Sequence, residues 1–426
     1  MAVGGDGVYL IDELGKRYLD ACCGAAVSCL GHSNEEVRNA IKEQTDKLAF
    51  AHTGFFTNEP MENLADFLIE RAPGDLDRVY FFSGGSEAVE GAIKLARQYF
   101  VEIGKPEKSR VIARWQSYHG NTLGALAAGG NKWRREQFKP LLVEMSHISP
   151  CYEYRDKKQG ESTESYGLRV ANELEEEINR VGAENVAAFI AEPVVGATMG
   201  CVPAVEGYLK RIREICDKYE VLLILDEVMC GMGRTGSLFA CEQDGVVPDI
   251  VTIAKGLGAG YQPVGAFIAS GKIHDAVRDG SGFFQHGHTY IGHAIACAAA
   301  LKVQQVVEEN NLLDNVKDKG AKLKKAFEDN FGDHANVGDI RGRGLFIGIE
   351  LVQDKFTKEP FDSSLGIPTK IKAACMSEGL MCYPMGGTID GQKGAHILFA
   401  PPFILEDSHI DEIIEKLKKA FSSSLS

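Results

Sequence analysis

The sequence lacks any apolar run of the length needed to cross a membrane, and no signal-peptide pattern opens it. An excess of positive charge is also lacking, because 46 Lys and Arg against 60 Asp and Glu give a formal net charge of −14. This acidic balance argues against nucleic acid or an anionic membrane surface as a main partner. We therefore expect a cytoplasmic protein that binds neither of them.

Cysteine pairing motifs are missing as well. The eleven cysteines are an odd number, include no Cys-x-x-Cys pair and stand mostly among apolar residues. In a chain of this length they are typical of reduced core residues in a cytosolic protein. A redox centre at Cys22–Cys23 is the disfavoured alternative. A metal site at His286-x-His288, near His293, would lack an acidic third ligand close in sequence, so we expect no metal.

Strand and helix patterns alternate from about Asp77 onward in this chain of 426 residues, which is longer than one ordinary hydrophobic core accommodates. The strand patterns include DRVYFFS, SRVIARW, NVAAFIAEPVV, VLLILDEV, DIVTIAKG and VGAFIAS, and the helix patterns include EAVEGAIKLARQYFVEIG and YGLRVANELEEEINRV. Continuous apolar, β-branched strands are typical of strands buried on both faces. The sequence therefore predicts an α/β fold with a mostly parallel central sheet and helices on both faces.

A smaller α+β domain is predicted from the two ends of the chain. Charged helix patterns flank the strand patterns GLFIGIELV and HILFAPPF near the C-terminus, and the opening pattern GVYLIDELGKRYLDA is expected to join them. The predicted division is 1–45 for the N-terminal part of the small domain, 46–295 for the large domain and 296–426 for the C-terminal part. The last five residues, SSSLS, are expected to fray.

Four predicted strand ends carry polar residues, and ligands of an open parallel sheet gather at such ends. They are Ser83-Gly84-Gly85-Ser86, Glu192, Asp226-Glu227 and Lys255. Asp226 and Lys255 each follow a strongly apolar run, so a carboxylate and an amine are expected to face the same cleft. A structural salt bridge between them is one alternative, although such buried pairs contribute little net stability. A lysine that simply reaches out to solvent is another.

Two glycine-rich stretches differ in what they predict. SGGSEAVEG follows the strand pattern VYFF and presents backbone N–H groups at a helix start, which predicts an anion site with the Ser86 hydroxyl beside it. A simple helix cap with glycines for the turn is the alternative. GMGRTG at Gly231–Gly236 matches G-x-G-x-x-G, but it does not follow its strand directly and no long helix comes after it before Pro248. We do not interpret it as a dinucleotide site.

One cofactor accounts for these features together. An anion site, the aromatic Tyr118 in QSYHGNT, a strand-end carboxylate and a strand-end lysine are what pyridoxal 5′-phosphate (PLP) requires, with the lysine bound as a Schiff base. LLILDEVMCGMGRTGSLFACEQDGVVPDIVTIAKGLGAG resembles the long signature of the class III aminotransferases, which have PLP fold type I. SGGSEAVE, SYHG, AEPV, HGHTYIGH, RGRGLFIGIEL and APPF match further landmarks of that family in order. The resemblance covers nearly the whole chain.

This resemblance implies catalytic roles for two residues. Lys255 would hold the cofactor, then take the proton from the substrate carbon and deliver it to C4′ of the cofactor. Such a base needs a pKa below the ordinary lysine value of about 10.4. Asp226 would keep the pyridine nitrogen protonated, so that the ring accepts the electrons of the broken C–H bond.

The resemblance also implies the cofactor's surroundings and a homodimer. Val228 would pack on one ring face and Tyr118 on the other, Gly85 and Ser86 would hold the phosphate, and Glu192 would lie near the ring. Thr289 would reach the phosphate of the partner subunit's cofactor. The helix pattern HAIACAAALKVQQVV is apolar enough for an interface, although an internal helix would have the same composition.

Departures from the family pattern bear on the substrate. Relatives that use ornithine or GABA carry a glutamine, a glutamate and an arginine where this chain has Met229, Ala197 and Leu398. The branch that uses ω-amino acids and amines with pyruvate is more similar at the first two positions. That branch often has an arginine and a tryptophan where this chain has Tyr383 and Ala26. Both usual carboxylate-binding arginines are therefore expected to be absent.

The predicted function is a PLP-dependent aminotransferase that moves an amino group from an amine or ω-amino acid to a small 2-oxo acid, pyruvate being favoured. Arg341 and Arg234 are candidate carboxylate anchors, although structural roles in turns are favoured for both. Another PLP reaction on the same scaffold is the alternative: decarboxylation-dependent transamination, or an aminomutase, racemase or phospho-lyase reaction. A catalytically silent PLP-binding regulator is disfavoured by the intact Lys255, Asp226 and Tyr118.

Overall fold

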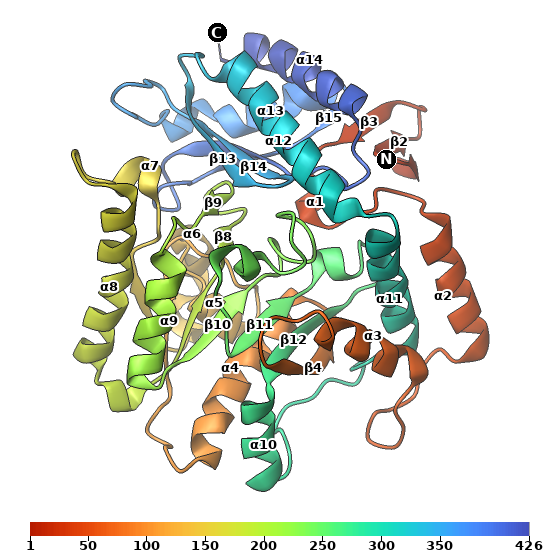
Figure 1. The fold of residues 1–426 in the computed structure, drawn as a ribbon. Coiled ribbons are helices and arrows are strands. Elements are labelled where there is room, and N and C mark those ends of the chain that lie inside the picture. Colours follow the sequence, from red (N-terminus) through yellow and green to blue (C-terminus); the bar gives the residue numbers. More distant parts are fainter. Residues whose placement is uncertain (426) are drawn as a thin grey trace.

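A seven-stranded sheet forms the centre of the computed structural model, which describes residues 1–425 (Figure 1). Its strands lie in the order β4 (Leu76–Phe82), β12 (Gly265–Ser270), β11 (Ile250–Ile253), β10 (Leu222–Asp226), β7 (Val186–Ala191), β5 (Arg110–Arg114) and β6 (Ser146–Ile148). β12 runs antiparallel to β4 and β11, and the other strands run in one direction. The predicted mostly parallel sheet is confirmed.

Helices cover both faces of this sheet because its strands are apolar on both sides. In β10, Leu223 and Leu225 contribute to one hydrophobic core, and Leu222 and Ile224 contribute to the other. The first core also contains residues of α3 (Glu59–Ile69), α8 (Thr163–Val181), α9 (Tyr208–Tyr219) and α11 (Ala294–Glu309). The second contains residues of α4 (Gly85–Glu102), α5 (Leu123–Ala128) and α10 (Gly271–Asp279). The prediction of strands buried on both faces is confirmed.

The pattern NVAAFIAEPVV, expected as one strand, is interrupted. β7 ends at Ala191, and the chain resumes as β8 (Val194–Val195), which pairs with β9 (Val202–Pro203) in a separate small ribbon. Pro193 stands between the two strands, and proline has no N–H with which to continue a ladder. The interruption leaves Glu192 in a loop at the carboxyl end of β7.

Two smaller four-stranded sheets are built from the ends of the chain. One contains β1 (Ala2–Asp6), β2 (Tyr9–Asp12), β3 (Arg17–Asp20) and β15 (Leu380–Met381). The other has the order β13 (Val337–Arg343), β14 (Phe346–Leu351), β17 (Ala395–Phe399) and β16 (Tyr383–Gly386). β3 pairs in parallel with β15, so strands from opposite ends of the chain are direct neighbours.

A third hydrophobic core lies under these smaller sheets. It contains residues of α12 (Leu312–Phe331), α13 (Ile367–Ser377) and α14 (Asp407–Ser424), which lie at the top of Figure 1. α11 contributes to this core through Val303, Val306 and Val307, and α11 also packs on α2 (Glu35–Lys47). α11 therefore bridges two cores close to residue 296, and the division at 45 and 295 stays a prediction. α14 continues to Ser424, so the fraying expected from Ser422 does not begin there; Ser426 lies outside the described residues.

Short helices complete the description. They are α1 (Cys23–Ala26), α6 (Lys132–Arg135) and α7 (Glu153–Asp156), with 3₁₀ turns η1 (Glu136–Leu141), η2 (Ala183–Asn185), η3 (Ala240–Asp244), η4 (Lys255–Leu257) and η5 (Ser363–Leu365). All eleven cysteines are buried and unpaired, which confirms the prediction of core cysteines. Among the helices of residues 1–425, none has both the length and the apolar character that a membrane crossing requires.

Candidate active site

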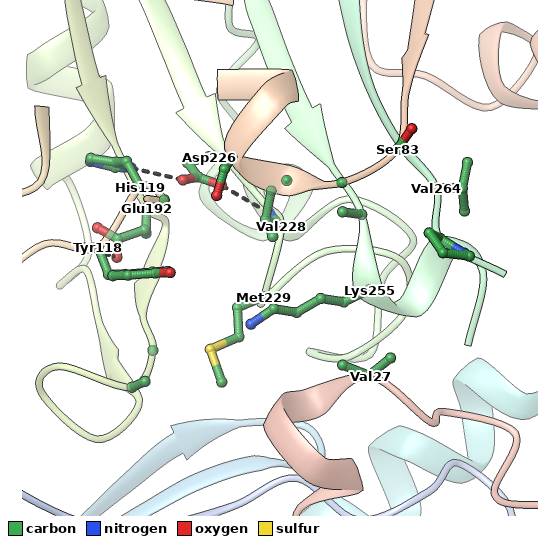
Figure 2. Close-up of a pocket in the computed structure, with 18 of the residues that line it drawn as sticks. Val27, Ser83, Tyr118, His119, Glu192, Asp226, Val228, Met229, Lys255 and Val264 are labelled. Carbon is green, nitrogen blue, oxygen red and sulfur yellow. Dashed lines mark hydrogen bonds and ion pairs between the residues drawn. The ribbon is translucent and has the colours of Figure 1, made fainter. Parts of the chain in front are cut away.

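A cavity of about 400 Å³ opens at the carboxyl ends of β4, β5, β7, β10 and β11 (Figure 2). Seven of the eight predicted site residues line it: Gly85, Ser86, Tyr118, Glu192, Asp226, Val228 and Lys255. The eighth, Thr289, is exposed and lies outside the lining. The structure thus brings together residues that are up to 170 positions apart in sequence, Gly85 and Lys255 among them.

Lys255 lies at the end of β11 with its amine pointing into the cavity (Figure 2). Its backbone has a φ of +44°, in the left-handed region that non-glycine residues seldom occupy and that is frequent at functional sites. Burial lowers its pKa from 10.5 to about 8, although the nearby Asp226 carboxylate acts in the opposite direction. The side chain is partly exposed but points into the cavity, which does not support the alternative of a lysine that extends away from the sheet into solvent.

Asp226 ends β10 and is almost fully buried. Its Oδ2 atom lies 2.7 Å from His119 Nδ1, and its Oδ1 atom accepts hydrogen bonds from the Val228 N–H at 3.0 Å and from the Thr252 hydroxyl at 3.1 Å. Asp226 contacts the His119 ring, and no salt bridge joins it to Lys255 within residues 1–425, so the salt-bridge alternative is not what the structure contains. Three neighbours therefore fix the carboxylate in one orientation at the cavity wall.

The N-terminus of α4 faces the cavity without a side-chain cap. The N-cap residue is Gly84, which has no side chain to accept hydrogen bonds from the first-turn N–H groups. A Cβ built on Gly84 would meet no atom within 4 Å, so there is open space in front of the helix start. Ser86 Oγ accepts a hydrogen bond from the Asn121 N–H at 3.0 Å. First-turn N–H groups and the positive end of the helix dipole make such a site suited to a phosphate.

Tyr118 and Val228 lie on the cavity wall to either side of the space in front of Asp226 (Figure 2). Glu192 supports this wall, because its Oε1 accepts a hydrogen bond from the Tyr118 N–H at 3.1 Å. Its Oε2 is buried without a hydrogen bond among residues 1–425 and lies 3.5 Å from Arg114 Nη2. Burial is the main reason that the pKa of Glu192 is raised.

Two contacts of the site were not predicted from the sequence. His119 follows Tyr118 in QSYHGNT and was given no role from the sequence, yet it is buried against Asp226, and its Nε2 has no hydrogen-bond partner among the residues described. Thr252 reaches the same carboxylate from the neighbouring strand, where it is the residue paired with Asp226. A threonine inside the apolar run DIVTIAKG was the only signal that could have found it.

The positions singled out for substrate choice fall into two groups. Met229 and Ala197 line the cavity. Ala26 and Leu398 are buried and pack, together with Met229 and the partly buried Tyr383, in one small apolar cluster. This cluster adjoins the cavity and offers no cation, as the sequence predicted.

Arg234 and Arg341 have structural roles, as the sequence analysis favoured. Arg234 Nη1 donates to the Leu345 carbonyl at 3.1 Å and to the Pro401 carbonyl at 2.6 Å. Arg341 Nη1 lies 2.5 Å from Glu350 and 2.9 Å from Asp339. Neither side chain lines the cavity.

Comparison with known proteins agrees with this geometry over the whole chain. The family description Aminotransferase class-III matches residues 1–421. The chain belongs to the class III aminotransferases. An uncharacterized aminotransferase of Schizosaccharomyces pombe is 46% identical over 99% of this chain and 92% of its own length.

Solved structures of the family have the same fold. An (S)-enantioselective omega-transaminase from Thermomicrobium roseum superposes with a TM-score of 0.94 at 38% identity, covering 100% of this chain and 93% of its own. The omega-transaminase from Pseudomonas jessenii in complex with PMP gives a TM-score of 0.94 at 32% identity, with coverages of 100% and 92%. Class III aminotransferases are PLP-dependent, so the fold is PLP fold type I, as predicted, and PLP is the cofactor.

The residues of this class III aminotransferase fit the cofactor. An uncapped helix start suits its phosphate, an oriented carboxylate suits its pyridine nitrogen, and a buried amine with a lowered pKa suits its aldehyde. The cavity is also narrow where glycine stands: a Cβ on Gly85 would lie 2.7 Å from Val228, and one on Gly120 would lie 2.6 Å from Ser86 Oγ. The polar groups of the cavity and its shape therefore both fit PLP, which is an anionic, aromatic aldehyde.

Proposed function

We propose that this aminotransferase moves an amino group from an amine or ω-amino acid to a small 2-oxo acid, with pyruvate as the acceptor. One observation carries the proposal: the buried amine of Lys255 and the fixed carboxylate of Asp226 face the same cavity from the ends of adjacent strands. Relatives titled omega-transaminases support the choice of donor. The lining near Met229 and Ala197 is uncharged, which suits a donor without a second acidic group.

Lys255 is the proposed point of covalent attachment and the proposed acid–base. When bound, PLP supplies an aldehyde for a Schiff base and a ring that accepts electrons. With a pKa of about 8, roughly one Lys255 amine in ten is neutral at pH 7, against fewer than one in a thousand for an unperturbed lysine. The neutral Nζ can attack a carbonyl carbon or take a proton from the substrate carbon.

Asp226 is the proposed partner of the pyridine nitrogen. A carboxylate there favours a proton on that nitrogen, because an opposite charge nearby stabilises the protonated form. His119, Thr252 and the Val228 N–H already hold three of its lone-pair directions, so the carboxylate is positioned before any ligand binds. His119 is the proposed positioning residue behind it.

Tyr118 and Val228 are the proposed ring contacts, and Gly85 and Ser86 the proposed phosphate contacts. The Tyr118 ring and the Val228 side chain border the space in front of Asp226, which supports a ring held between them. Glu192 is proposed to orient Tyr118 through the hydrogen bond to its N–H.

A donor and acceptor panel tests the reaction. Purified enzyme is supplied with 1-phenylethylamine, β-alanine, ornithine and GABA as donors, each with pyruvate or 2-oxoglutarate, and the new amino acid is quantified. We expect alanine from pyruvate with the first two donors at the highest rates. Release of carbon dioxide without a new amino acid would contradict transamination, and a preference for 2-oxoglutarate would contradict the pyruvate assignment.

We further propose a homodimer in which Thr289 reaches the partner subunit's cofactor. Thr289 is exposed and does not line the cavity of its own subunit. Large exposed apolar side chains lie near it in sequence or space, including Tyr290 at 60% exposed and Phe283 at 64% exposed, and Phe50 packs edge-on against Tyr290. Exposed apolar clusters of this kind are typical of interfaces.

Subunit mixing tests this arrangement. Lys255→Ala and Thr289→Ala variants are each expected to be impaired, the first fully and the second through weaker PLP binding. In a mixed dimer, the site with Lys255 would receive the intact Thr289 of the other subunit. We expect mixing to restore one site of wild-type PLP affinity per mixed dimer; a monomer in sedimentation, or no restoration on mixing, would contradict the proposal.

The lowered pKa of Lys255 predicts how PLP uptake depends on pH. Because only the neutral amine attacks the aldehyde, the rate constant of uptake by the apoenzyme should rise about tenfold per pH unit up to about pH 8 and then level off. Stopped-flow absorbance of the bound cofactor measures it. A rate that keeps rising to pH 10, as for an exposed lysine, would show that the amine is not perturbed by burial.

Gly120→Ala is expected to weaken PLP binding. The φ of Gly120 is +136°, and the new Cβ would lie 2.6 Å from Ser86 Oγ and 2.7 Å from Ser86 Cα, so the helix start must move. We expect about a tenfold or greater loss of PLP affinity, in line with 1–3 kcal/mol of strain. Gly104→Ala is the matched control, since Gly104 also has a positive φ of +76° but no atom within 4 Å of a new Cβ; equal PLP affinities for the two variants would contradict the prediction.

A further inference from the structure

The turn that begins at Lys255 leaves two of its carbonyl groups without a backbone partner. The backbone hydrogen bonds of η4 use the carbonyls of Ala254 and Lys255. The carbonyls of Gly256 and Leu257, the next two residues, accept no backbone hydrogen bond within residues 1–425. Both residues are buried, and a buried carbonyl group is unfavourable unless a donor reaches it. These two oxygens therefore need a donor from elsewhere in the fold.

The side chain of Gln304 supplies both hydrogen bonds. Gln304 lies on α11 and is 1% exposed, and its Nε2 donates to the Gly256 carbonyl at 3.0 Å and to the Leu257 carbonyl at 2.9 Å. The opposite orientation of the amide would turn its oxygen toward two carbonyl oxygens, so the two acceptors fix the orientation. α11 thereby holds the turn after Lys255 from a point 47 positions further along the chain than Leu257.

Packing of α11 does not account for a glutamine at this position. Ala300 and Val307, which share the same helix face, are buried and apolar. The Oε1 atom of Gln304 is buried and has no hydrogen-bond partner within the part of the chain that the structure describes. An unpaired buried acceptor is unfavourable, and an apolar side chain of similar volume would avoid it. What such a side chain would lack is the donor for the two carbonyls, so the glutamine serves the turn.

The turn is constrained from other directions as well. A Cβ built on Gly256 would lie 3.2 Å from Met232 Cβ, so the turn is packed between Met232 and α11. Cys29 Sγ makes a further, weak hydrogen bond to the Gly256 carbonyl at 3.6 Å. The left-handed φ of +44° at Lys255 persists only where the surroundings enforce it. The direction of the Lys255 side chain follows from this backbone conformation.

We infer that Gln304 is a positioning residue for the reaction: through the two carbonyls it fixes the backbone of η4 and thereby the direction of the Lys255 amine in the cavity. The inference rests on the proposed role of Lys255. Displacement of a reacting group by about 1 Å costs about 100-fold in rate. Gln304 does not line the cavity, so its loss should affect the reactions of the amine and leave substrate binding nearly unchanged.

Three variants test the inference. Gln304→Met has a similar volume and no donor. Gln304→Glu keeps the shape of the side chain, and because burial favours the protonated carboxyl it retains one donor. Gln305→Met is the matched control, since Gln305 is the next residue of α11 and its side chain makes no hydrogen bond within residues 1–425.

Each variant is measured in three ways. Stopped-flow absorbance gives the rate constant of PLP uptake by the apoenzyme at pH 7. Circular dichroism in the near-visible region reports how the lysine-bound cofactor is oriented in the protein. Steady-state kinetics with 1-phenylethylamine and pyruvate separate kcat from KM. The first two measurements do not depend on turnover.

Gln304→Met should lower the uptake rate constant about tenfold and kcat about 10- to 100-fold, with KM changed by less than about threefold and a weaker dichroism band. Gln304→Glu should fall between this variant and wild type, and Gln305→Met should match wild type. A Gln304→Met protein that loses only thermal stability, or whose loss is confined to KM, overturns the inference.

The comparison stays decisive if Gln304→Met does not fold. Gln304→Glu alone should then take up PLP at least about threefold more slowly than wild type, because it can satisfy only one of the two carbonyls. Uptake at the wild-type rate overturns the inference. If wild-type enzyme transaminates neither substrate, the proposed function fails, and the uptake rates and dichroism still decide the role of Gln304.

Discussion

Lys255→Ala is expected to lower kcat by about 10⁴-fold or more, because the substitution removes both the covalent attachment of PLP and the proton-transferring amine. The fold should tolerate it: the amine of Lys255 is buried with a pKa lowered to about 8, which means that its charged form is disfavoured in the folded chain. The variant should therefore remain folded while losing the absorbance of the lysine-bound cofactor.

Lys132→Ala is the control for the loss of a lysine, since Lys132 is exposed and remote from the cavity lining. It should retain wild-type rate and absorbance. Activity of Lys255→Ala within tenfold of wild type would remove Lys255 from the mechanism. A folded variant with unchanged near-visible absorbance would place the cofactor's covalent bond elsewhere.

Asp226→Asn is the second large effect. It replaces a buried charged partner of the proposed pyridine nitrogen by a neutral amide and also alters the hydrogen-bonded contact with His119 Nδ1 at 2.7 Å. Losing one member of a buried, hydrogen-bonded charge pair costs about 2–5 kcal/mol, so we expect kcat/KM to fall about 30- to 5,000-fold. Steady-state rates at saturating PLP measure it, with circular dichroism to verify the fold.

Glu227→Gln is the matched control for Asp226→Asn. Glu227 is the next residue and equally buried, but it does not line the cavity; its two oxygens accept hydrogen bonds from the N–H groups of Ala240 at 2.5 Å and Cys241 at 2.8 Å. An amide can accept only one of them, so this variant should lose thermal stability while keeping its kcat near wild type. If both variants lose activity equally, the proposed role of Asp226 has no support.

Much of the site could be predicted because it follows from strand ends. The apolar runs before Asp226 and Lys255 form β10 and β11, which are adjacent and parallel. The side chains at the ends of these two strands therefore lie at the same edge of the sheet. The anion site at the start of α4 could also be predicted, because a helix start without a capping side chain leaves its backbone N–H groups available to a ligand. These inferences need only the order and direction of the strands.

The remainder depends on contacts that no local pattern encodes. His119 reaches Asp226 across 107 positions of sequence, and Arg134 lies over Tyr118 only because the segment after β5 turns back on itself. The proline at position 193 signals a strand interruption in the sequence itself, but the pattern NVAAFIAEPVV was still interpreted as one strand. The proposed role of Thr289 involves another subunit, and the fold of one chain does not determine it.

Borohydride reduction of the holoenzyme, followed by peptide mapping, tests the central claim most directly. Reduction converts the imine between PLP and its lysine into a stable amine, so the pyridoxyl group stays on the residue that held it. The account predicts that the label lies on the peptide containing Lys255 and that Lys255→Ala takes up no label. A pyridoxyl group on any other lysine of the wild-type protein, or none at all in a protein saturated with PLP, would contradict it.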